Sequence, residues 1–220
     1  MKINITNINL DPATGGGGNS GGGNSGGGKI RLPNGITLRG STFTEFDMGQ
    51  HDWGAVYDWS YMFSNCTKLT EVKNWPAEIK SLNCERMFFG CDNIVTAPMI
   101  NTSECTDMSW MFCNDDNLES VPYYNTSKVK NFESMFSGCN KLSSTSEFDL
   151  SSATTTKNMF WYCYKLTYIQ FRGNPVNLTN TKDMFYEIRG AGRMFYPAEY
   201  AENYQIIIDQ LPSQWTAIAY

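Results

Sequence analysis

Histidine, positive charge and long apolar runs are scarce in this sequence. The one histidine, His51, provides little for metal binding or acid–base catalysis, and no serine or cysteine is spaced to act with it. Lys and Arg number 17 against 22 Asp and Glu, so we expect no basic nucleic-acid-binding surface. No stretch approaches the roughly 18 apolar residues of a membrane-spanning helix, and the first residues lack the apolar run of a signal peptide. We therefore expect no enzyme, no nucleic-acid partner and no membrane insertion.

Cysteines are present but do not form recognisable pairs. Their number is odd and no Cys-x-x-Cys motif occurs, so neither a disulfide framework nor a zinc site is indicated. We expect free, mostly buried thiols, no metal and no other cofactor. The seven cysteines are Cys66, Cys84, Cys91, Cys105, Cys113, Cys139 and Cys163.

Composition divides the chain into three segments. Residues 1–14 form a short peptide, residues 15–28 consist only of Gly, Asn and Ser, and the remainder has globular composition. The middle segment has almost no side chains to bury, so we expect a flexible linker there. In the remainder we expect a solenoid with an N-terminal cap (29–55), repeats (56–190) and a C-terminal cap (191–220).

The dipeptide Met-Phe recurs at intervals of 25, 24, 24, 24 and 25 residues, which predicts stacked coils of one repeat. A cysteine lies four residues after the methionine in four of the six copies, and in most copies a leucine or isoleucine lies seven after it. This register indicates that the Met-Phe pairs are core positions. The copies are centred on Met62, Met87, Met111, Met135, Met159 and Met184.

Two spacings alternate within each copy. Apolar residues first recur every three or four positions, as at Val129, Phe132 and Met135, which predicts one or two turns of helix. The spacing then becomes strand-like, as at Leu166 and Ile169. These features predict an α/β repeat, namely a leucine-rich-repeat-like solenoid of about 24–25-residue coils with a short parallel sheet.

The end of the chain differs from the repeats and predicts a cap. Residues 198–211 carry apolar side chains at helical spacing, and residues 215–220 form a strand-like segment. A solenoid must cover the apolar face of its last coil, so we expect a capping helix followed by a strand.

The repeat units resemble those of a known family. Residues 125–142 read NTSKVKNFESMFSGCNKL, and residues 101–118 read NTSECTDMSWMFCNDDNL. These units resemble the BspA-like leucine-rich repeats of bacterial surface proteins, which share the pattern V-x-x-M-x-x-M-F-x-x-C-x-x-L. The resemblance covers about residues 57–186 and implies a displayed solenoid that adheres to proteins or cells and has no catalytic residues. The chain departs from that family because it has no signal peptide and carries the peptide and linker in front.

Strand geometry places alternate residues outside the core, and stacking aligns them in columns across the sheet. One column is rich in aromatic residues, which are favoured in contacts with protein or glycan ligands. The alternative is that Trp75, Tyr124 and Phe148 pack under neighbouring loops. The candidate binding face comprises Trp75, Ile100, Tyr124, Phe148 and Arg172, with Tyr168 and Gln170 from adjacent columns.

The first segment is too short to fold alone, so its apolar residues either stay disordered or dock on another protein. Ile3 and Ile5 alternate with polar residues, which suits strand addition to the sheet edge of a partner. The candidate anchor comprises Ile3, Ile5, Ile8 and Leu10.

An adhesion module without a secretion signal can reach the outside as part of a virus particle. We therefore predict a non-enzymatic bacteriophage component at the virion surface, a head or tail decoration or fibre. Its N-terminal peptide would bind a virion or envelope protein, and its sheet would bind a host protein or glycan. The alternatives are a bacterial cell-surface or secreted adhesin, and a purely structural capsid cement protein.

Overall fold

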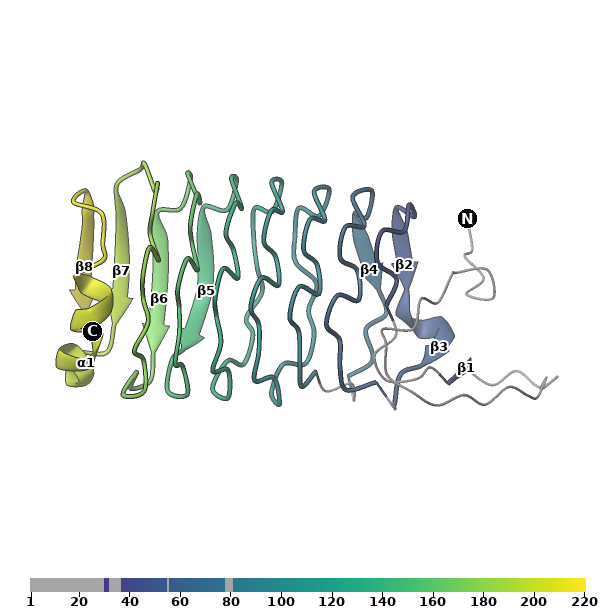
Figure 1. Cartoon of the computed structure of the whole chain (residues 1–220), viewed down its shortest axis with the longest axis horizontal. Coiled ribbons are helices and arrows are strands. Elements are labelled where there is room, and N and C mark those ends of the chain that lie inside the picture. Colours follow the sequence, from purple (N-terminus) through teal and green to yellow (C-terminus); the bar gives the residue numbers. More distant parts are fainter. Residues whose placement is uncertain (1–29, 32–36, 55, 78–80) are drawn as a thin grey trace.

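Successive copies of the repeat stack into a parallel β-solenoid of about seven turns (Figure 1). A computed structural model describes residues 30–31, 37–54, 56–77 and 81–220. The coils follow one another along the long axis of the molecule, and the C-terminal elements close one end (Figure 1). The predicted anchor residues Ile3, Ile5, Ile8 and Leu10 and the predicted linker 15–28 lie outside the described residues.

The strands at the N-terminal end are short, and they pair in parallel. β1 (Ile30–Arg31) pairs with β3 (His51–Asp52), and β2 (Glu45–Asp47) pairs with β4 (Glu71–Lys73). A 3-10 helix, η2 (Met48–Gln50), lies between β2 and β3. The next coils are joined by isolated parallel bridges.

A four-stranded parallel sheet forms the C-terminal part, in the order β5-β6-β7-β8. This sheet agrees with the parallel sheet that the sequence predicts. Its strands are β5 (Ser144–Asp149), β6 (Tyr168–Arg172), β7 (Gly192–Tyr196) and β8 (Trp215–Ala219).

The predicted helix within each repeat is wrong, because the residues around each Met-Phe pair form tight turns. In every copy the residue before the methionine and the third residue after it have positive φ, as at Ser134 (55°) and Gly138 (78°). Two left-handed residues so close together interrupt a right-handed helix. The N–H of Met135 closes a turn on the carbonyl three residues earlier (3.2 Å), whereas the N–H of Phe136 donates to Met159 O in the next coil (2.9 Å). Stacked turns therefore reproduce the apolar spacing of a helix.

The Met-Phe pairs form the core, as predicted. All six methionines are fully buried, and their phenylalanines are at most 3% exposed. The phenylalanine rings stack in one column, in which Phe88 and Phe112 lie 5.4 Å apart and Phe112 and Phe136 lie 5.8 Å apart, nearly parallel. Each coil thus buries the ring of its neighbour, which makes the coils mutually dependent.

The cysteines are buried free thiols, also as predicted. In the column four residues after methionine, Cys139 Sγ donates to Phe112 O and Cys163 Sγ donates to Phe136 O, both at 3.0 Å. Burial raises the pKa of the Cys66 thiol to about 11, which keeps it protonated as a donor. The cysteine column therefore fills the core and supplies hydrogen-bond donors to backbone carbonyl groups.

Asp115 replaces cysteine in that column in the third copy. Its side chain is fully buried, Oδ1 accepts the N–H of Cys91 at 2.7 Å, and Oδ2 has no hydrogen-bond partner among the described residues. Burial raises the pKa of the Asp115 carboxyl well above its usual value. Burial thus favours the neutral form of this carboxyl.

The C-terminal cap is confirmed as a helix followed by a strand. The 3-10 helix η3 (Ala198–Tyr200) leads into α1 (Ala201–Ile208), which buries Tyr204 and Ile207. Tyr204 stacks on Phe171 at 6.3 Å. β8 then extends the sheet beyond β7, so the cap covers both the apolar core and the last inner strand.

Candidate functional site

Two residues of the predicted binding face belong to the core. Tyr124 is 1% exposed and Phe148 is fully buried. The Tyr124 ring stacks on Phe112 at 6.3 Å, and its hydroxyl donates to Pro98 O at 2.7 Å. Phe148 contacts Phe136 at 5.8 Å. The prediction that these two rings face solvent is wrong, and the packing alternative is correct for both.

A bulge in β5 explains the error for Phe148. The pairing of β5 with β6 shifts by one residue between Ser144 and Glu147, so that Phe148 lies opposite Phe171 and not opposite Arg172. One extra residue exchanges the inner and outer faces of a strand. Uniform alternation cannot anticipate such a shift.

The other residues of the predicted face lie at intermediate depth. Trp75 and Ile100 pack partly buried against the core, with the Trp75 ring 5.7 Å from Trp59. Tyr168 and Gln170 are half-buried neighbours joined by a hydrogen bond from the Tyr168 hydroxyl to Gln170 Oε1 at 2.8 Å. The column therefore does not form an exposed aromatic surface.

Arg172, the last residue of the predicted face, ties neighbouring coils together. Its Nη2 donates to the Tyr123 hydroxyl at 2.7 Å, across 49 residues of sequence. Its Nε lies 3.5 Å from Glu147 and 3.6 Å from Asp149. Because its charge is compensated inside the structure, Arg172 contributes mainly to the solenoid itself.

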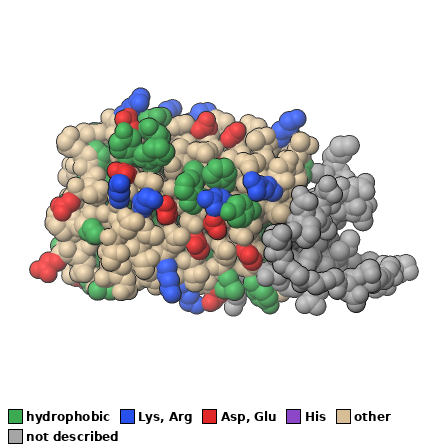
Figure 2. Space-filling model, in the orientation of Figure 1, with side chains coloured by type: hydrophobic (Ala, Val, Ile, Leu, Met, Phe, Trp, Pro, Cys, Tyr) green, Lys and Arg blue, Asp and Glu red, His purple; other side chains and the backbone are tan. Residues whose placement is uncertain are grey.

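Aromatic residues that are exposed or half-buried gather instead on the turns of the last two Met-Phe copies. Trp161 and Tyr186 occupy the same position in successive copies, two residues after methionine, and their ring centroids lie 6.0 Å apart. Tyr162 lies 4.3 Å from Trp161, 5.8 Å from Tyr186 and 5.6 Å from Tyr164. We call these four residues the aromatic patch. Figure 2 shows hydrophobic side chains gathered in groups on the face in view, one toward the α1 end.

The backbone at Tyr162 is unusual for a bulky residue. Its φ is 60°, in the left-handed region, whereas the same position in four earlier copies holds Asn65, Gly90, Asn114 and Gly138. Gly and Asn adopt this conformation readily, but a large side chain there costs on the order of 1 kcal/mol. The fold itself therefore gains nothing evident from a tyrosine at this position.

Arg189 and Glu187 border the aromatic patch. The Arg189 guanidinium lies 4.3 Å from the centroid of the Tyr164 ring, and its Nη2 lies 3.4 Å from Glu187 Oε2. Shielding from water raises the pKa of Tyr162 above its usual value, and the neighbouring Tyr186 adds to the shift. The Tyr162 hydroxyl therefore stays neutral and can both donate and accept hydrogen bonds.

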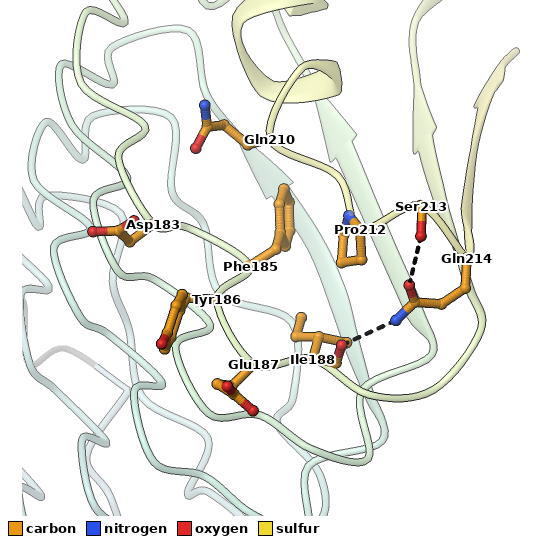
Figure 3. A pocket seen from close by; sticks show the side chains of 9 residues that line it. All are labelled: Asp183, Phe185, Tyr186, Glu187, Ile188, Gln210, Pro212, Ser213 and Gln214. Carbon is orange, nitrogen blue, oxygen red and sulfur yellow. Dashed lines mark hydrogen bonds between the residues drawn. The ribbon is translucent and has the colours of Figure 1, made fainter.

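A hollow of about 360 Å³ adjoins the patch at the C-terminal end (Figure 3). Tyr186 and Glu187 border both features, so the hollow and the patch form one continuous surface. Gln214 Nε2 closes one side by donating to Ile188 O at 3.0 Å. We call this feature the end hollow, and its lining residues are Asp183, Phe185, Tyr186, Glu187, Ile188, Gln210, Pro212, Ser213 and Gln214.

Backbone donors of the last Met-Phe copy border the end hollow. In the preceding copy, the N–H of Phe160 donates to the next coil, to Met184 O at 2.9 Å. The equivalent N–H groups of Asp183, Phe185 and Glu187 have no acceptor among the described residues. The cap continues the sheet through β8 but adds no further Met-Phe turn over these donors.

The patch could have been found from the sequence by a different comparison. The interior columns repeat the same residue types, and the turn columns two and three residues after methionine hold mostly Ser, Asn and Gly until Trp161 and Tyr162. A column-by-column search for departures from the repeat would have singled out these positions. The search for alternation along strands missed them because the turns are not strands.

The family described as Mycoplasma protein of unknown function, DUF285, matches residues 36–99 and 82–194. The chain belongs to this family. The DUF285 matches together include all six Met-Phe copies and the aromatic patch. No curated protein and no solved structure matches the chain.

Two general features of the DUF285 chain bear on the type of site. Over the described ranges, no helix has the length and apolar character needed to cross a membrane. Within the same ranges, no group of three or more His, Cys, Asp or Glu residues is arranged to hold a metal ion.

Proposed function

We propose that this chain is a non-enzymatic adhesion module that binds its ligand through the aromatic patch. The observation that carries the proposal is the clustering of Trp161, Tyr162 and Tyr186 on adjacent turns, with Tyr162 at positive φ where the first four copies have Asn or Gly. Strained positions that the fold does not require are typical of functional sites. Tyr186, which is 47% exposed, adds a ring that the core does not use.

The resemblance to BspA-like repeats supports the same function. Members with this repeat pattern are displayed and adhere to proteins or cells, and we extend both the leucine-rich-repeat assignment and the adhesive role to this chain as proposals. A rigid solenoid suits such a role because its stacked turns hold exposed rings at fixed spacing. Side chains on such a scaffold lose little further freedom on binding.

The carrier of the module stays a prediction. A virion surface is the first expectation, and a bacterial surface or secreted adhesin and a capsid cement are the alternatives. Mass spectrometry of purified particles and cell-envelope fractions from one culture separates them. Recovery in particles, lost on deletion of residues 1–14, supports a virion anchor, whereas recovery in the envelope alone contradicts it.

Replacements taken from other copies of the repeat test the binding role. We suggest the triple variant Trp161→Ser, Tyr162→Asn and Tyr186→Ser, because Ser64, Ser137 and Asn65 hold equivalent positions. Beads coated with the wild-type chain or the variant are compared for retention on cell monolayers and on mucin-coated surfaces. Loss of retention by the variant supports the proposal.

A matched control removes a turn-face tryptophan elsewhere. Trp110 has positive φ like Asn158 in the same column, so Trp110→Asn follows the repeat and leaves the patch intact. The control should retain wild-type binding. Equal retention of the triple variant and the wild type would overturn the role of the patch.

A further inference from the structure

We infer that the aromatic patch and the end hollow together bind a neutral carbohydrate chain. This inference rests on the proposed function, because it names the ligand of the same site. It follows from the kinds of group present, their arrangement and their charge.

The rings of the patch suit the apolar faces of sugars. The C–H bonds of a pyranose ring carry slight positive charge and are attracted to the negative face of an aromatic ring. Trp161 and Tyr186 lie in adjacent coils with centroids 6.0 Å apart and planes inclined by 31°. A sugar chain lying along the solenoid axis would meet one ring per coil.

The end hollow suits the hydroxyl edges of sugars. Asp183 and Gln210 contribute a planar carboxylate and a planar amide, each able to bond two neighbouring hydroxyls. Glu187 and Gln214 add further oxygen and N–H groups beside their contacts with Arg189 and Ile188. The unpaired N–H groups of the last copy add donors beside them. A volume of about 360 Å³ lies within the range of small-molecule sites, which is about 300–1,000 Å³.

A protein ligand fits this surface less well. Protein interfaces combine aromatic anchors with aliphatic contacts at a dry centre. The exposed aliphatic side chains of the described residues, such as Met99 (71%) and Val176 (63%), belong neither to the patch nor to the lining of the end hollow. The patch instead combines ring faces with polar groups, as a sugar does.

The charge of the site favours neutral sugars over acidic ones. Asp183 and Glu187 bring two carboxylates to the end hollow. Arg189, the cation beside the patch, already pairs with Glu187 and covers Tyr164. Sialylated or sulfated chains would meet a net negative charge from these three residues.

Glycan binding is tested with the full chain on an array of neutral and acidic oligosaccharides and on mucin-coated surfaces. One set of mucin surfaces is treated with periodate, which cleaves the vicinal diols of sugars, and another with protease. We expect binding to neutral oligosaccharides in preference to sialylated or sulfated ones, and loss of mucin binding after periodate. Trp161→Ser should weaken binding about tenfold or more, and Trp110→Asn should leave it unchanged.

The outcomes separate this inference from the proposed function. If patch-dependent binding survives periodate but is lost after protease, the ligand is a protein and the carbohydrate inference is wrong. Preference for acidic sugars, or equal binding by Trp161→Ser, also overturns it. If the patch variants bind every surface as the wild type does, the proposed function itself is wrong.

A second variant tests the hollow separately. Gln210→Ala removes one amide from the lining, and its side chain is exposed, so the fold should tolerate the change. Weaker binding of neutral sugars is expected, with unchanged thermal stability. Unchanged affinity would exclude the hollow as part of the site.

Discussion

Two clusters on the turn face contain tryptophan, but they use their rings differently. In the N-terminal cluster, the Arg86 guanidinium lies 5.4 Å from the Tyr61 ring and 5.0 Å from the Trp110 ring. Arg86 Nη1 also donates to the Tyr61 hydroxyl at 2.6 Å. The faces of both rings are thus engaged by one cation, and we call these three residues the first stack.

In the aromatic patch the rings meet mainly one another. Arg189 lies over Tyr164 alone among the described rings, and Tyr186 remains 47% exposed. The comparison shows that aromatic content by itself does not mark a binding site. The distinguishing features are that no cation lies over Trp161, Tyr162 or Tyr186 among the described residues and that Tyr186 is left exposed.

The largest expected loss of stability comes from a change in the core beneath both clusters. Phe136→Ala removes a fully buried ring from the phenylalanine column and should lower the free energy of unfolding by about 3–5 kcal/mol. Tyr186→Ser removes a ring from the patch and should change it by about 0.5 kcal/mol or less. Urea denaturation followed by circular dichroism measures both, and equal losses would contradict the contrast.

Asp115 departs from the repeat inside the core, whereas Tyr162 departs from it on the turn face. Since its folded-state pKa is raised, the folded state keeps a proton that the unfolded state releases above about pH 4. The contribution of Asp115 is therefore most favourable at low pH and falls as pH rises. Asp115→Cys, which restores the column, should raise the free energy of unfolding at pH 7 by about 1–3 kcal/mol.

The pH dependence of stability tests whether the raised pKa of Asp115 is the cause of this effect. Relative to the wild type, Asp115→Asn should become more stable as the pH rises above about 4, because the amide cannot ionise. Urea midpoints at several pH values measure this. A difference that stays constant with pH would show that Asp115 does not retain its proton in the folded state.

Breaking the first stack should have a moderate effect on stability and none on binding. Arg86→Ser removes the cation from between two rings, and each such contact is worth about 0.5–1 kcal/mol at exposed sites. We expect a loss of about 1–2 kcal/mol in the free energy of unfolding and unchanged retention on mucin. Reduced retention would extend the binding surface to the first stack.

Relieving the strain in the patch should have a small effect on stability, and a stabilising one. Tyr162→Asn places at φ 60° a residue that tolerates this conformation, so the free energy of unfolding should rise by up to about 1 kcal/mol. Thermal unfolding measures the change. A lower melting temperature would show that Tyr162 contributes to the fold more than its position suggests.

The sequence predicts much of the fold because the interior repeats. Met-Phe pairs at fixed spacing identify the core column, and the unlike end predicts α1 and β8. The helix within each copy is not predictable from apolar spacing alone, because two residues at positive φ produce the same spacing through turns. Tyr61 and Trp110 occupy such positions without being Gly or Asn, so residue type gives no reliable signal there.

The candidate site is harder to predict than the fold. The chosen column on the sheet contains Tyr124 and Phe148, which are core residues. A bulge turns Phe148 inward, and Tyr124 stacks on Phe112 of the phenylalanine column. The residues of the patch come from turns of two coils that meet only by stacking. The end hollow depends on how the cap covers the last coil, which periodicity does not describe.

The most direct measurement compares stability and binding in one triple variant, Trp161→Ser, Tyr162→Asn and Tyr186→Ser. These replacements follow other copies of the repeat, so the account predicts a melting temperature at or above that of the wild type. It also predicts that retention on mucin-coated surfaces is lost. A variant that is equally stable and still binds as the wild type would contradict the central claim that the aromatic patch exists for binding.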